Sequence, residues 1–73
     1  MDTQTRTETG VVRKLREGYG FIAGNDGIDY FLHWTAMRPE SKLFRELVVG
    51  DRVEFEKHTA PKGPRAIEVR VTP

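Results

Sequence analysis

The stretch from residue 18 to residue 34 constrains the fold of this chain more than any other. It reads GYGFIAGNDGIDYFLHW, and the tetrapeptide at 24–27 is a turn signal between two strand-like runs. Two such runs joined by a short turn predict an antiparallel β-hairpin. Because successive side chains of a strand leave opposite faces, the hairpin also predicts which residues share a surface.

Four rings fall on one predicted face of this hairpin. Tyr19 and Phe21 are two residues apart on the first run, and Phe31 and His33 repeat that spacing on the second. The apolar side chains between them point the opposite way, where they can enter a core: Ile22 and Leu32.

Both faces of the hairpin therefore carry apolar or aromatic groups, whereas a half-buried strand normally alternates apolar with polar residues. A chain of 73 residues buries only a modest core. One face is then an exposed aromatic platform, of the kind on which single-stranded nucleic acid stacks at ~1–3 kcal/mol per base. Gly18 and Gly20 have no side chains to block it. The alternative is that the rings are core residues of a small β-domain.

The two motifs resemble the paired RNA-binding motifs of the cold-shock domain family. The match runs without a gap through residues 18–37, with Thr35-Ala36-Met37 where that family usually has Ser-Ala-Ile. The resemblance covers residues 10–71, with two short length changes. It implies an all-β fold, a five-stranded antiparallel barrel of the oligonucleotide-binding class, with stacking residues on its second and third strands.

Three departures from the family pattern cluster at one end of the presumed binding face. Lys14 falls where the family has a stacking Trp, Glu17 replaces a Lys, and the segment between Lys14 and Gly18 is two residues shorter than in the family. A lysine cannot stack a base, but it can contact a phosphate as a point charge. One nucleotide subsite is therefore expected to differ from the family's.

Turn and periodicity signals predict the rest of the chain. Residues 1–6 are expected to form a flexible tail before a domain of residues 7–73, whose first strand begins near Thr7. A helical turn or a short helix is expected within 38–47, between the third and fourth strands, since Pro39 suits a first helical position and Leu43 and Leu47 are four residues apart.

Period-two alternation predicts a fourth strand at 52–57. A run of helix and strand breakers predicts a loop at 60–64, and residues 65–71 are expected to close the barrel as the fifth strand.

Composition limits the classes of function. There is no cysteine, hence no disulfide or thiolate site, and no apolar run long enough to span a membrane. We therefore expect a cytoplasmic domain without a membrane partner. The net charge of +1, from 12 basic and 11 acidic residues, argues against affinity that rests mainly on phosphate neutralisation.

Catalytic and metal chemistry have little support in the sequence. His33 has only His58 as a second imidazole, at no metal-ligand spacing, so no metal and no cofactor are predicted. Asp26 and Asp29 are two carboxylates three residues apart, a spacing that can indicate acid–base chemistry, but turn formation is the commoner reason for Asp beside Gly. Asp29 is also a candidate acceptor for a base edge. No nucleophile–base pair is present, and we predict that the protein is not an enzyme.

Two further aromatic residues are predicted to flank the four rings. Phe44 occupies the position of a family aromatic, after a loop two residues longer than the family's. Trp34 is either the edge of the platform or a structural anchor. Backbone contacts are expected from four basic residues, unless these are ordinary solvated charges: Arg13, Lys14, Lys62 and Arg65.

These features predict binding of single-stranded RNA or DNA by stacking, with low sequence specificity, and favour a monomer over a dimer. The resemblance to the cold-shock domain family implies an RNA chaperone. The rival is a protein-interaction module whose aromatic face meets a protein partner. Salt discriminates the two, because nucleic-acid binding weakens steeply with salt and a hydrophobic contact does not.

Overall fold

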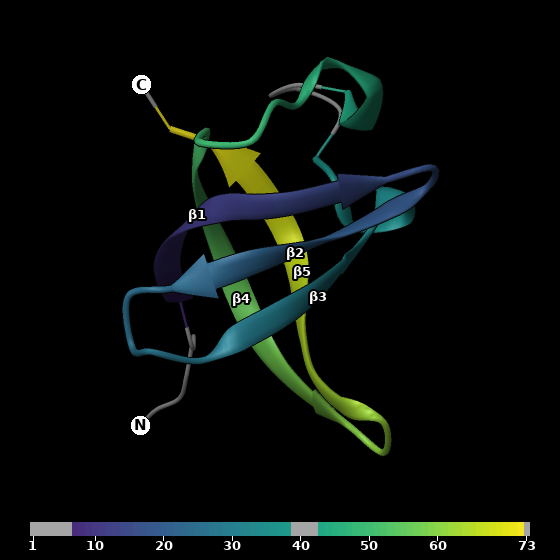
Figure 1. Cartoon of the computed structure of the whole chain (residues 1–73). Coiled ribbons are helices and arrows are strands. Elements are labelled where there is room, and N and C mark those ends of the chain that lie inside the picture. Colours follow the sequence, from purple (N-terminus) through teal and green to yellow (C-terminus); the bar gives the residue numbers. More distant parts are fainter. Residues whose placement is uncertain (1–6, 39–42, 73) are drawn as a thin grey trace.

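The computed structural model describes residues 7–38 and 43–72, and its strands form a closed barrel in the order β1-β2-β3-β5-β4 (Figure 1). The all-β, five-stranded prediction is confirmed. The predicted tail at 1–6 lies outside the described residues. The elements are β1 (Thr7–Arg16), β2 (Tyr19–Gly24), β3 (Asp29–His33), the 3-10 turns η1 (Trp34–Ala36) and η2 (Phe44–Glu46), β4 (Arg52–Ala60) and β5 (Gly63–Val71).

One strand pair corrects the expectation of a wholly antiparallel barrel. The β1–β2, β2–β3, β1–β4 and β4–β5 pairs are antiparallel, but β3 and β5 are parallel, with Phe31 opposite Arg65. The reason is geometric. Strand directions cannot alternate all the way round a ring with an odd number of members, so closing five strands leaves one parallel pair.

The β4–β5 hairpin is longer than predicted. Thr59 pairs with Pro64 and Ala60 with Gly63, so the loop expected at 60–64 shrinks to a two-residue turn at 61–62. Gly63 has a φ of +126°, which a residue with a side chain rarely adopts and which lets the chain reverse this tightly. The hairpin tip projects beyond the barrel at the lower right of Figure 1.

Among the described residues, the helical turn or short helix considered within 38–47 is seen as the 3-10 turn η2. Residues 39–42, including the proposed first helical position, lie outside the described residues. Leu43 is 42% exposed, whereas Leu47 is 6% exposed and belongs to the core, so the two leucines do not form one buried helical face.

The barrel interior is a single apolar cluster. Ile22 and Leu32 have no exposed surface, which confirms the inner face predicted for the hairpin. The remaining buried side chains come from β1, β3, β4, β5 and the segment after η2: Val12, Tyr30, Leu47, Val53, Phe55, Ala66 and Val69.

Gly20 has a different role from the one expected. It alternates with Tyr19 and Phe21, so it faces inward rather than onto the aromatic surface, and it pairs with Leu15 of β1. A Cβ at this position would overlap the carbonyl oxygen of Lys14. Close packing of β1 on β2 therefore requires this glycine, whereas an open binding surface does not.

Candidate nucleic-acid interface

Strand register brings the predicted rings together on the outer face of the hairpin. Tyr19 is paired with His33, and Phe21 with Phe31. The Tyr19 and Phe31 rings are stacked, with centroids 5.9 Å apart and planes 25° apart. The Phe21 ring lies edge-on to both phenyl neighbours, with centroids 5.8 Å from Phe31 and 6.3 Å from Tyr19.

The row of rings continues past the end of β3. His33 lies 6.4 Å from Phe31 between ring centroids, and Trp34 lies 6.0 Å from His33. The Trp34 side chain is 56% exposed, while its backbone N–H donates to the Gly18 carbonyl at 3.0 Å. The two roles considered for Trp34 are thus compatible: its backbone anchors the chain and its ring extends the row.

A polar contact orients the His33 ring. Its Nδ1 lies 2.7 Å from the Thr35 hydroxyl and accepts the Thr35 backbone N–H at 3.3 Å, which caps η1. Both contacts occupy the same ring nitrogen. They therefore hold the imidazole at the edge of the row while Nε2 makes no hydrogen bond within the described part of the chain.

The rings remain accessible although they touch one another. Tyr19 is 38% exposed, and Phe21, Phe31 and His33 are half-buried. The surface that they form with Trp34, here called the ring row, lies opposite the wholly buried inner face of the same two strands. A small barrel has one interior, so the second apolar face stays in contact with solvent.

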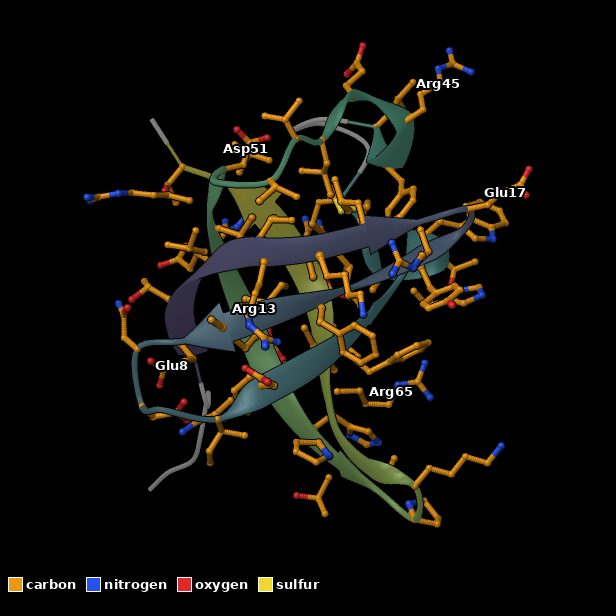
Figure 2. The ribbon with its side chains drawn as sticks, viewed as in Figure 1. Glu8, Arg13, Glu17, Arg45, Asp51 and Arg65 are labelled. Carbon is orange, nitrogen blue, oxygen red and sulfur yellow. The ribbon has the colours of Figure 1, made fainter. Side chains whose placement is uncertain are left out.

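A groove of about 890 Å³ adjoins the Phe21 end of the ring row. One wall comes from β1 and the β2–β3 hairpin, and the other from the β4–β5 hairpin. The fold here unites residues that are about 50 positions apart in the sequence. Figure 2 labels two of the lining residues, one from β1 and one from β5. The charged lining residues are Arg13, Lys14, Asp29, Lys62 and Arg65.

Arg13 and Asp29 form an ion pair across this surface, with Nη1 and Oδ2 3.1 Å apart. Arg13 sits in a β-bulge of β1, where the register with β2 shifts between Val12 and Lys14. Both side chains are more than half exposed, so the pair contributes little to stability. It does hold the Asp29 carboxylate at the rim of the groove.

Phe44 is not brought to the ring row. It lies in η2, is half-buried and packs against the core cluster. None of the ring pairs found among the described residues includes it. Its predicted stacking role therefore has no support from its position.

A polar cluster at the turn of the β2–β3 hairpin was not predicted from the sequence. The buried Tyr30 donates its hydroxyl to Asp26 at 2.5 Å, and the Lys57 ammonium lies 3.5 Å from Asp26 and 3.6 Å from Glu8. Burial, and then this hydrogen bond, raise the pKa of Tyr30, while the donated hydrogen bond lowers the pKa of Asp26 below its ordinary 3.8. A tyrosine at an inward-facing position four residues after an aspartate was the available signal.

Within residues 7–38 and 43–72, no three histidine or acidic side chains gather closely enough to hold a metal ion. No helix in the same ranges is long and apolar enough to cross a membrane.

A closed five-stranded barrel with an exposed ring row on β2 and β3 is consistent with the oligonucleotide-binding class of fold. A family model described as the "Cold-shock" DNA-binding domain matches residues 8–72. The chain belongs to the cold-shock domain family, whose members bind nucleic acids.

Curated relatives agree with this assignment. The chain is 45% identical over 56 residues to a "Cold shock-like protein" of Thermotoga maritima, which covers 77% of this chain and 82% of the relative. It is 46% identical over 55 residues to a "Probable cold shock protein A" of Mycobacterium tuberculosis, covering 74% and 79%. It is 41% identical over 64 residues to "Cold shock-like protein CspJ" of Salmonella typhi, covering 84% and 89%.

Proposed function

We propose that this protein binds single-stranded RNA or DNA by stacking successive bases on the ring row. The observation that carries the proposal is the row itself: touching rings on an exposed face whose opposite side is fully buried. Every base has a π-face, and each stacked base contributes ~1–3 kcal/mol without sequence readout. Low sequence specificity follows.

The strand's backbone would lie along the groove beside the Phe21 end of the row. Four basic side chains that line this groove would contact the phosphates: Arg13, Lys14, Lys62 and Arg65. The net charge of the whole chain is only +1, so these local charges matter more than the overall charge. Affinity would then divide between stacking, which salt changes little, and a few phosphate contacts, which salt weakens.

Stacking of this kind supports the action of an RNA chaperone. A protein that binds only the unpaired strand shifts the pairing equilibrium toward that strand by mass action. The stacking of one base pair on the next is worth on average ~1.4 kcal/mol per step in DNA, so a few stacked bases offset the loss of a few pairs. We propose that the protein acts as a monomer and binds nucleic acid without catalysing a reaction. A cytoplasmic location remains a prediction.

The test uses Trp34 as its reporter. Oligothymidine is titrated into the protein, and Trp34 fluorescence is followed at low and moderate salt. We expect saturable quenching, with log affinity falling by about 0.7 per phosphate contacted for each tenfold rise in salt. Phe31→Ala should reduce the affinity by about five- to 150-fold, corresponding to ~1–3 kcal/mol for one base.

Phe31→Leu is the matched control, since it keeps an apolar side chain and removes only the ring. If stacking is the mechanism, the Leu variant should lose nearly as much affinity for oligothymidine as the Ala variant. Binding that Phe31→Leu retains would mean that apolar contact, rather than ring stacking, holds the strand. Absence of oligothymidine binding at low salt would instead support a protein-interaction module. A polarization assay with labelled oligothymidine covers the case in which Trp34 lies outside the occupied part of the row.

A further inference from the structure

Three cationic side chains around the groove have no anionic partner. Among the described residues, Lys14, Lys62 and Arg65 form no ion pair and donate no side-chain hydrogen bond to an acid, although all three line the same groove. The Arg13 charge is already balanced by Asp29. The groove therefore carries an excess of about three positive charges, in a chain whose total is +1.

One of these cations is also incompletely hydrogen-bonded. The Nε atom of Arg65 is buried and has no hydrogen-bond partner within the described residues. A buried guanidinium N–H without an acceptor is costly, because the group has lost water and gained nothing in exchange. Arg65 also lines the groove, where its guanidinium can donate to an anionic oxygen.

The ring row ends where these cations begin. Phe21 and Phe31 are the only aromatic residues that line the groove, and Lys14 is the residue of β1 paired with Phe21. At the opposite end, the row extends through His33 to Trp34. A strand that stacks along the row thus meets no further ring beyond Phe21, and meets positive charge instead.

A terminal phosphate fits this surplus of charge better than an internal one. An internal phosphodiester carries one negative charge, whereas a phosphomonoester carries about −1.5 to −2 near neutral pH and offers three acceptor oxygens. We propose that the groove binds the terminal phosphate of a single strand whose last base stacks on Phe21 and Phe31. This inference rests on the proposed function, and it adds selection for strands that end in a phosphate.

Three hexathymidines test the inference: one with a 5′-phosphate, one with a 3′-phosphate and one with neither. Because the strand lies along the row in one direction, only one of the two phosphates can reach the groove. We expect that phosphate to tighten binding by about tenfold, the gain of one charge-assisted contact. Lys14→Ala and Lys62→Ala should each abolish most of this gain, and should weaken binding of the unphosphorylated strand by less than binding of the phosphorylated one.

Arg52→Ala is the matched control. Arg52 is an exposed cation of β4 that forms no ion pair among the described residues and does not line the groove, so its loss changes the net charge equally. It should leave the phosphate gain intact. Equal gains from the 5′- and 3′-phosphates, no gain from either, or a gain that survives Lys14→Ala would each overturn the inference. Absence of binding by the unphosphorylated strand would instead contradict the proposed function.

Discussion

The two faces of the β2–β3 hairpin carry side chains of similar chemistry and meet different surroundings. On the inner face, Ile22, Tyr30 and Leu32 are at most 2% exposed. On the outer face, Tyr19 is 38% exposed and its ring neighbours are half-buried. Apolar character therefore does not by itself tell which face of a strand enters the core. In a barrel this small, the interior accepts one face, and the other is left for binding.

The faces should separate cleanly in their effects on stability and on binding. Leu32→Ala, on the inner face, should lower the free energy of unfolding by about 2–5 kcal/mol, since it removes a fully buried side chain and leaves a cavity. Urea unfolding followed by circular dichroism measures the loss. At temperatures where the variant is still folded, its affinity for oligothymidine should stay near that of the parent protein. If Leu32→Ala unfolds with the same free energy as the parent protein, the inner face of the hairpin does not form the core.

Gly20 lies between Tyr19 and Phe21 in β2, and its substitution should also lower the free energy of unfolding. Gly20→Ala should lower the free energy of unfolding by about 1–3 kcal/mol, because the added methyl group overlaps the Lys14 carbonyl and Leu15 of β1. Gly27→Ala is a control without a steric clash, since nothing lies within 4 Å of an added Cβ there and only its φ of +87° is strained. Unfolding that is equally affected in both variants would argue against close β1–β2 packing at Gly20.

Tyr19→Ala tests the outer face. Binding of oligothymidine should weaken by ~1–3 kcal/mol, the contribution of one stacked base. The free energy of unfolding should change less than in Leu32→Ala, because the ring is partly exposed already. Because Tyr19 and Phe31 are stacked at 5.9 Å, the Tyr19→Ala and Phe31→Ala effects on binding should not add. Additive losses would show that the two rings hold bases independently.

The smallest expected change in stability concerns Tyr30, whose ring faces inward on this hairpin. Tyr30→Phe removes the hydroxyl that donates to Asp26, and it should destabilise the protein most near neutral pH. The lowered pKa of Asp26 contributes stability that is lost as the pH falls below about 3.8, and the raised pKa of Tyr30 contributes stability that is lost as the pH rises above about 10. The difference between parent and variant should therefore shrink at both extremes.

Urea unfolding at neutral pH, below pH 3.8 and above pH 10 measures this difference. Tyr19→Phe is the control, because the Tyr19 hydroxyl has no hydrogen-bond partner among the described residues. If the loss of unfolding free energy in Tyr30→Phe does not vary with pH, the hydroxyl contributes by packing rather than through its contact with Asp26.

Much of the fold was predictable because its signals are local. The turn at 24–27 and the spacing of Tyr19, Phe21, Phe31 and His33 placed the hairpin and its two faces, and both Ile22 and Leu32 lie in the core as expected. The exact extent of the β4–β5 hairpin was not predictable in this way. Proline and glycine usually interrupt strands. Here they are strand residues of β5 because they pair with residues of β4 across the hairpin.

The candidate site was predictable in part. The ring row follows from period two along two adjacent strands, so the sequence contains it. Phe44 shows the limit of this reasoning, because it was assigned through a resemblance across a loop of different length, and the structure packs it against the core. The Tyr30–Asp26 hydrogen bond was not predicted, because the position of the Asp26 carboxylate relative to the Tyr30 hydroxyl depends on the conformation of the turn between them.

The amino-acid sequence by itself determined the all-β class, the hairpin and the pairing of rings on one face, since these depend on side-chain alternation and turn chemistry within 17 neighbouring residues. Only the tertiary structure decided that β3 and β5 run parallel, and that Lys14, Lys62 and Arg65 line one groove. Those contacts join residues far apart in the chain. Their geometry is set by barrel closure, which brings the β4–β5 hairpin against β3 and is not encoded in any local pattern.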